Sequence, residues 1–289
     1  MKTLLSRLRK YEIQIRKAVD SQMRGDFHSI FKGSGITFDD VRAYQYGDDV
    51  RTLDWNVSAK GHGMFVKIFK EEKEQTVFFL MDVSASQEIG LKSQQKIDLA
   101  KEICGVLALS AINEAGQVGM ICFSDQKEKY MKPGKGLKHG YELLLNLFQL
   151  EAISKKTDLN AAIIYALQRI KRKSVIILVS DFVDENYERS LTAMSQKHDL
   201  VVIRVADGKE EKIPQMGIVP VWQQESGKML WVNTSSTEFK QTLAKHFQSK
   251  TFSLEKFCRK HDANYLSVQT GEDFIPKLIR LFKVRNLKK

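Results

Sequence analysis

The chain has 289 residues, of which 43% are hydrophobic and 28% charged, and it contains four prolines. This composition is typical of a globular protein with a sizeable core and excludes a largely disordered chain. The formal net charge of +11 makes nucleic acid and anionic membranes candidate partners. However, residues 1–24 hold seven Lys/Arg against two Asp/Glu, and residues 240–289 hold twelve against four. Solvated helix faces explain this distribution better, because the two ends lack the interleaved aromatics of single-strand binders.

The cysteines predict a reducing compartment. Cys104, Cys122 and Cys258 are widely spaced and form no C-x-x-C pair, so we expect buried thiols rather than disulfides or a zinc site. Charges interrupt every apolar stretch near the N-terminus, which argues against a signal peptide. No apolar run approaches the roughly 20 residues that a spanning helix needs. We therefore expect a cytoplasmic protein without a transmembrane segment.

The first 75 residues predict a unit of their own. Apolar residues recur at helical spacing between Leu4 and Val19, which predicts an amphipathic helix. Residues 25–75 are interrupted by glycines and rich in Asp and Arg, so we expect a small subdomain held by buried ion pairs and aromatics. The predicted domains are thus residues 1–75, with this helix and subdomain, and residues 76–289, an α/β domain with C-terminal helices.

From Thr76 onward strand and helix patterns alternate. This alternation predicts a doubly wound, mainly parallel α/β sheet with helices on both faces. The predicted strands are residues 76–83, 117–123, 174–180, 200–205 and 264–268, with a short edge strand near 128–131. The predicted helices are residues 94–114, 139–150, 159–171, 187–197, 237–261 and 274–284. A hairpin is expected within residues 219–232, turning around Ser226 and Gly227.

Three loops of this sheet carry oxygen donors at positions where such sheets bind ligands. The apolar strand TVFFLMD leads into an Asp-x-Ser-x-Ser array, the run SVIILVS leads into a further Asp, and a Thr precedes a predicted helix. The carboxyl ends of parallel strands meet at one edge, so we expect these side chains to converge. The candidate ligands are Asp82, Ser84, Ser86, Thr157 and Asp181.

An all-oxygen set suits Mg²⁺, or Mn²⁺, better than Zn²⁺. If the hydroxyls are the direct ligands and the carboxylates act through water, the ion keeps positive charge for an acidic side chain of a partner. A structural alternative stays open, in which the serines cap a helix and the aspartates bind loop amides.

These residues carry a resemblance to known families. Residues 76–205 resemble a von Willebrand factor A domain, whose metal-ion-dependent adhesion site has an Asp-x-Ser-x-Ser array followed by a Thr and an Asp. The five candidate ligands match that motif, and Gln87 stands at a non-ligand position where many such domains have Met. The match implies the fold of these domains and a Mg²⁺ site that binds proteins.

The segment FDDVRAYQYGDDVRTLDW resembles the signature of the bacterial domain-of-unknown-function family fifty-eight, which places it just before a von Willebrand factor A-like domain. The residues that carry this likeness are Phe38, Arg42, Tyr44, Gly47, Asp48, Asp49, Arg51, Asp54 and Trp55. Members of the family are often encoded beside MoxR-type AAA+ ATPases and Bat aerotolerance proteins. The resemblance therefore implies a MoxR-type AAA+ ATPase as partner.

Other interpretations of the motifs are weaker. The acidic residues of the signature alternate with Arg42 and Arg51, which favours internal ion pairs over a second acidic site, with a recognition surface as the alternative. Haloacid-dehalogenase-like phosphatases need a second Asp two residues after the first, and Ser84 stands there. The sequence also has no P-loop, H-E-x-x-H or G-x-S-x-G motif. It thus predicts a non-catalytic protein-binding module, with a metal-dependent phosphoesterase or a basic nucleic-acid-binding protein as alternatives.

Overall fold

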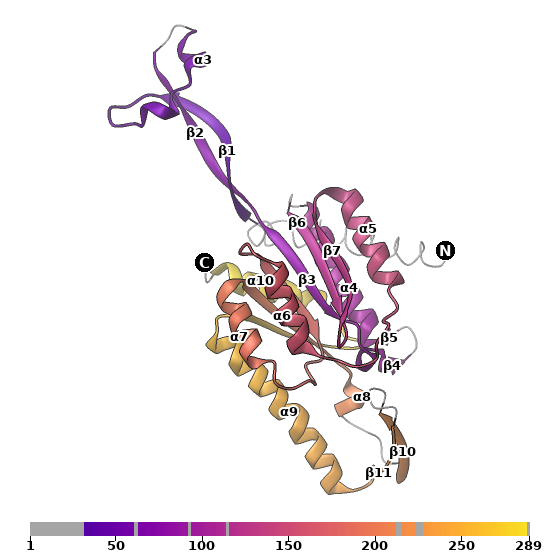
Figure 1. The fold of residues 1–289 in the computed structure, drawn as a ribbon. Coiled ribbons are helices and arrows are strands. Elements are labelled where there is room, and N and C mark those ends of the chain that lie inside the picture. The colour runs from indigo at the N-terminus through magenta and orange to yellow at the C-terminus, as the bar shows by residue number, and fades with distance from the viewer. Residues whose placement is uncertain are drawn as a thin grey trace.

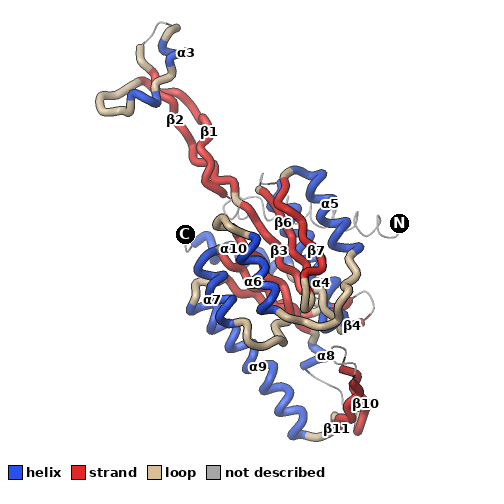
Figure 2. Tube along the Cα trace, viewed as in Figure 1, coloured by secondary structure: helices blue, strands red, loops and turns tan. Residues whose placement is uncertain are grey.

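The computed structural model describes residues 32–60, 63–91, 94–113, 116–211, 216–223 and 228–287. Its centre is a six-stranded sheet of order β12-β9-β8-β3-β6-β7 (Figures 1 and 2). The strands are β3 (Thr76–Asp82), β6 (Gln117–Phe123), β7 (Lys127–Gly134), β8 (Val175–Ser180), β9 (Asp199–Ala206) and β12 (Asn264–Gln269). All neighbours pair in parallel except β7, which is antiparallel to β6 at one edge. The predicted doubly wound α/β sheet is confirmed.

Helices cover both faces of this sheet (Figure 1). They are α4 (Lys96–Asn113), α5 (Gly136–Gln149), α6 (Leu159–Arg169), α7 (Glu188–Lys197), α9 (Thr237–Lys260) and α10 (Ile275–Leu287). Residues of α4, α5 and α10 share one buried apolar cluster, and residues of α6, α7 and α9 share the other. Because the faces are covered separately, each strand must be apolar on both sides.

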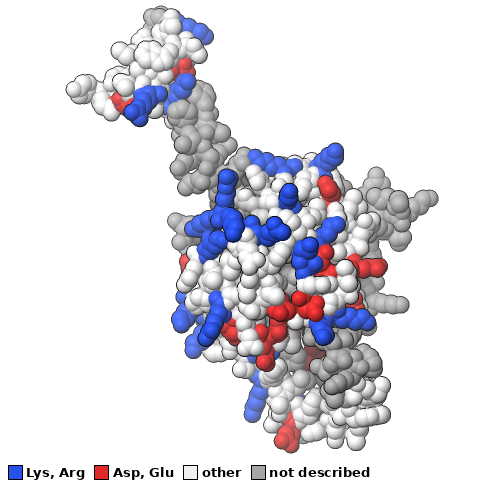
Figure 3. Space-filling view, viewed as in Figure 1, with Lys and Arg blue, Asp and Glu red and all other residues white. Residues whose placement is uncertain are grey.

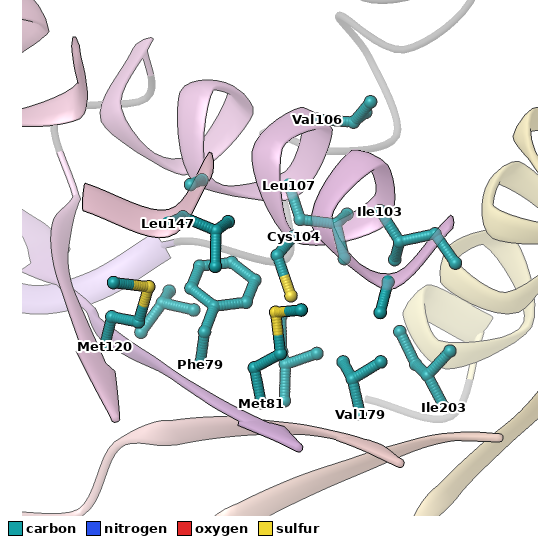
Figure 4. Close-up of a cluster of buried hydrophobic side chains, with 14 of the residues drawn as sticks. Phe79, Met81, Ile103, Cys104, Val106, Leu107, Met120, Leu147, Val179 and Ile203 are labelled. Carbon is teal, nitrogen blue, oxygen red and sulfur yellow. The ribbon is translucent and has the colours of Figure 1, made fainter. Parts of the chain in front are cut away.

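The central strand β3 shows this division most clearly. Val77, Phe79 and Met81 point into the cluster under α4, as Figure 4 shows for the last two, whereas Phe78 and Leu80 belong to the opposite cluster. All five side chains are buried. The continuous apolar run of the sequence therefore arises because successive residues of a strand face opposite layers.

Smaller elements lie between the main ones. They are η3 (Ala85–Glu88), β4 (Gly90–Leu91), β5 (Gln94–Gln95), α8 (Gly208–Glu211), β10 (Ile218–Gln223) and β11 (Lys228–Asn233). The antiparallel pair β10–β11 confirms the predicted hairpin. The three cysteines are buried and free, as expected. Among the described helices, none is long and apolar enough to cross a membrane.

The segment before the sheet forms a long antiparallel ribbon of β1 (Lys32–Ala43) and β2 (Phe65–Glu74), which projects from the body (Figure 1). The short helices η2 (Val50–Thr52) and α3 (Trp55–Ser58) lie at its far end, where Leu53 and Val66 are buried. The helix predicted between Leu4 and Val19 lies outside the described residues. The domain division at residue 75 stays a prediction.

Among the described side chains of this segment, the ion pair and two aromatics at the end of the ribbon are exposed, which contradicts the prediction of buried ones there. The Arg42 guanidinium donates to both carboxylate oxygens of Asp48, at 2.7 and 2.8 Å, but this pair is exposed. It raises the pKa of Arg42 and lowers that of Asp48, chiefly through the hydrogen bonds themselves. Tyr46 is fully exposed and Trp55 is 70% exposed. A two-stranded ribbon offers no second layer to cover such groups, and Gly47 completes the exposed turn with a φ of 106°.

Candidate metal-binding site

The candidate site lies at the carboxyl ends of two adjacent parallel strands. Asp82 is the last residue of β3, and Asp181 follows the last residue of β8. Met81 lies opposite Val179 in the ladder, so the two carboxylates emerge side by side at one edge. The sheet register therefore brings together two residues that are far apart in the sequence.

Asp82 is completely buried and holds the serine loop in place. Its Oδ1 accepts hydrogen bonds from the Ser84 backbone N–H at 3.0 Å and from the Ser84 hydroxyl at 2.7 Å. Its Oδ2 accepts from the Ser180 hydroxyl at 2.7 Å and from Gln87 Nε2 at 3.3 Å. Burial raises the pKa of Asp82 to about 6, and the nearby charge of Asp181 adds to the rise, whereas the serine hydrogen bonds oppose it. Asp82 is thus fully engaged in orienting its neighbours.

The serine hydroxyls are arranged for a cation. Ser84 donates its hydrogen to Asp82, and its Oγ lies 3.0 Å from Ser86 Oγ. Since a hydroxyl has one hydrogen and two lone pairs, the lone pairs of Ser84 remain free to accept from Ser86 or to bind an ion. The pair therefore presents oxygen atoms whose direction is fixed by the buried aspartate beneath them.

A pocket of about 420 Å³ opens above these residues. Its walls are Ser86, Thr157, Asp181, Val183, Asp184, Glu185 and Asn186. Three of the five predicted ligands thus line one pocket, and the other two are hydrogen-bonded directly beneath it. The structure brings all five together, while metal binding by them stays a prediction.

The wall of the pocket after β8 is built from an unusual backbone. Phe182 and Asn186 have φ angles of 57° and 63°, in the left-handed region that costs roughly 1 to 2 kcal/mol for an L-residue. Phe182 is held there by burial and by an edge contact to Tyr187, with ring centroids 5.9 Å apart. The Val183 N–H donates to Asp181 Oδ1 at 3.3 Å. These contacts orient the Asp181 carboxylate toward the pocket.

A further contact joins this wall to the loop of Thr157. Asp184 Oδ2 accepts a hydrogen bond of 2.7 Å from the backbone N–H of Leu159, the first residue of α6. Asp158 caps the same helix by accepting from the Ala161 N–H at 2.7 Å. A carboxylate is favourable at a helix N-terminus, where N–H groups lack partners. The two loops that carry Thr157 and Asp181 are therefore fixed relative to each other.

Sequence reasoning missed Lys96, the first residue of α4. This lysine is completely buried, and its ammonium lies 2.8 Å from Asp181 Oδ2 and 2.8 Å from Glu210 Oε1. Burial is the strongest influence on the pKa of Lys96 and lowers it, but the two carboxylates outweigh it and leave the pKa raised. The available signal was its position, because Lys96 shares a helical stripe with the buried Leu99, Ala100 and Ile103.

The donor chemistry fits a hard divalent cation, with two carboxylates and three hydroxyls. Among the described residues no group of three or more His, Cys, Asp or Glu side chains could hold a metal. The candidate set is not of that kind, since three of its five side chains are hydroxyls. The residues present would thus suit Mg²⁺ or Mn²⁺ rather than a soft metal.

Comparison with known proteins establishes the family. The chain matches the family described as "Protein of unknown function DUF58" over residues 40–252, most of its length. The chain belongs to this family. Among curated relatives, the "Uncharacterized protein Rv1480" of Mycobacterium tuberculosis is 24% identical over 287 residues, which cover 98% of this chain and 90% of the relative. The signature segment from Arg42 to Trp55 lies inside the matched range.

Solved structures similar to this DUF58 chain include the conserved hypothetical protein BatB from Bacteroides thetaiotaomicron. The TM-score is 0.49 at 14% identity, and the likeness covers 74% of this chain and all of BatB. A second is the manganese-loaded TRAP protein of Plasmodium vivax, with a TM-score of 0.39 at 15% identity, covering 73% of this chain and 72% of TRAP.

Proposed function

We propose that this protein is a non-catalytic, Mg²⁺-dependent protein-binding module that captures an acidic side chain of a partner. The observation that carries the proposal is that the candidate ligands have different surroundings in the site. Asp82 is surrounded by hydrogen-bond donors, whereas Ser86, Thr157 and Asp181 face the pocket. An ion bound there would have hydroxyls among its direct ligands, with at most one direct carboxylate.

The charge of the site supports an acidic ligand. An ion that meets few direct carboxylates keeps much of its positive charge, so a carboxylate from outside completes its coordination favourably. Asp184 and Glu185 form part of the pocket wall, and acidic side chains gather on the lower half of the body in Figure 3. Without a cation this surface repels an acidic partner, so binding requires the metal.

A MoxR-type AAA+ ATPase is the partner that we propose. The support is the family membership together with the resemblance of the signature segment to proteins encoded beside such ATPases. A cytoplasmic location goes with this partner. In this role the chain is an adaptor that binds the ATPase through the metal ion.

Titration calorimetry of a MoxR-type ATPase against this chain tests the proposal. We expect binding with Mg²⁺ that is lost in EDTA and weakened in Ser86→Ala, Thr157→Ala and Asp181→Ala. Equal affinity in all four proteins with and without metal would show that the site is not the docking point. Metal-dependent hydrolysis of phosphoesters that disappears in Asp82→Ala would instead assign the protein to the phosphoesterases.

A further inference from the structure

Lys96 joins three separate parts of the fold beneath the candidate metal site. It begins α4, and its ammonium donates to Asp181, 85 residues away, and to Glu210 in α8, 114 residues away. The Lys96 side chain is inaccessible to solvent, and those of Asp181 and Glu210 are 4% and 17% exposed. Such a buried ammonium between two carboxylates is costly to desolvate. Removal of any one of the three groups would leave a buried charge without full compensation.

We propose that Lys96 is a fixed internal cation that lowers the affinity of the five-residue candidate site for a free divalent ion. This inference rests on the proposed function, in which that site binds such an ion. The lysine acts through Asp181 and does not touch the ion or the partner, so it is a positioning residue.

Two effects of the ammonium oppose the metal. It donates to Asp181 Oδ2, while Oδ1 already accepts from the Val183 N–H, so a divalent ion would share each carboxylate oxygen with another donor. It also places a positive charge 2.8 Å from a carboxylate that the ion would share. Because Lys96 is shielded from water, salt and solvent screen this repulsion only weakly.

Glu210 acts in the opposite direction. It accepts from the same ammonium at 2.8 Å and so offsets part of the positive charge that Asp181 experiences. Removing the charge of Glu210 would strengthen the hold of Lys96 on Asp181. In the wild-type protein, Lys96 neutralises part of the negative charge of Asp181 that the ion would otherwise meet. The carboxylate of the partner protein supplies negative charge in its place, so the metal and the partner bind cooperatively.

Titration of the full chain with Mn²⁺, followed by the electron paramagnetic resonance signal of the free ion, tests this inference. We expect Lys96→Met to bind Mn²⁺ more tightly than wild type, because a buried positive charge next to Asp181 is removed. The expected change is about 10 to 100-fold, which is the size, but the opposite direction, of the usual effect of removing a group that orients a metal ligand. Glu210→Gln should bind it more weakly. The matched control is Lys101→Met, which removes another buried lysine of the same helix and should leave the affinity unchanged.

The possible results distinguish the role of Lys96 from the existence of the metal site. Unchanged or weaker binding in Lys96→Met, or unchanged or tighter binding in Glu210→Gln, overturns the role of Lys96. If circular dichroism shows that Lys96→Met is unfolded, the Glu210→Gln result alone decides. If wild type, Lys96→Met and Lys101→Met all fail to bind Mn²⁺, the metal site itself is wrong. Wild-type binding that is lost in Ser86→Ala but equal in Lys96→Met rejects only the role of Lys96.

Discussion

The Ser180 hydroxyl donates to Asp82 Oδ2 at 2.7 Å, and the two residues are 98 positions apart in the sequence. They are the last residues of the adjacent strands β8 and β3. The bond therefore connects the two strand ends from which the candidate ligand loops begin. It also compensates for part of the cost of burying the Asp82 carboxylate.

Ser180→Ala should lower the free energy of unfolding by about 1 to 3 kcal/mol, because it leaves a buried carboxylate oxygen with one donor fewer. Urea denaturation measures the change. Ser190→Ala is the control, since that buried serine of α7 donates to the neutral carbonyl of Tyr187, just before the helix, and its loss should cost less. A wild-type midpoint in Ser180→Ala would show that Asp82 does not need this bond.

Asp184→Ala should destabilise the protein by about 0.5 to 2 kcal/mol, because the N–H of Leu159 at the start of α6 loses its acceptor. Asp184→Asn is the matched variant. Its amide oxygen can still accept this bond, so it should retain most of the stability. Thermal unfolding of both variants provides the comparison, and equal losses in the two would contradict a capping role.

Trp55→Ser should change the free energy of unfolding by less than about 0.5 kcal/mol, although Trp55 is one of the residues that carry the resemblance to the family signature. Its side chain is 70% exposed at the end of the ribbon. Phe79→Ala, in the centre of the sheet, should cost about 3 to 5 kcal/mol in the same urea experiment. A large loss of unfolding free energy in Trp55→Ser would contradict the exposed position of this side chain.

His198 should make stability depend on pH. Burial lowers its pKa from 6.5 to about 4, with a smaller contribution from Lys197. Within the described part of the chain neither ring nitrogen has a hydrogen-bond partner. Between these two pKa values the unfolded chain binds a proton that the folded chain does not, so stability falls as the pH falls.

The contribution of His198 is fully present above pH 6.5 and is lost as the pH falls through about 4. At 1.36 kcal/mol for each pKa unit, the loss is roughly 3 kcal/mol. Urea unfolding of wild type and His198→Phe at pH 7 and pH 4 isolates this contribution. A difference between the two proteins that stays the same at both pH values would contradict it.

The sheet could be predicted because its evidence is local. The run from Thr76 to Asp82 is apolar on both faces, and only a strand covered on two sides needs that pattern. The ribbon of β1 and β2 could not be predicted in the same way. Its strands leave the body and pair with each other, so their pairing does not depend on the layers that cover the sheet.

The candidate site was foreseeable only in part. The convergence of Asp82 and Asp181 follows from parallel strands that end at one edge of a sheet. The pairing of Lys96 with Asp181 and Glu210 depends on where α4 and α8 pack, which no local pattern reveals. Gln87 was predicted only to be a non-ligand, and its position in the sequence does not reveal that its buried amide donates to Asp82.

Binding of Mn²⁺ to Ser86→Ala and Thr157→Val tests the central claim most directly, because both side chains line the pocket and neither belongs to the apolar clusters. The control is Thr192→Val on α7, whose hydroxyl donates to the Glu188 carbonyl away from the pocket. We predict that wild type and Thr192→Val bind one ion per chain, and that each pocket variant binds about 10-fold more weakly or worse. Equal Mn²⁺ binding in all four proteins, or none in wild type and none in Lys96→Met, would contradict a metal site formed by these oxygens.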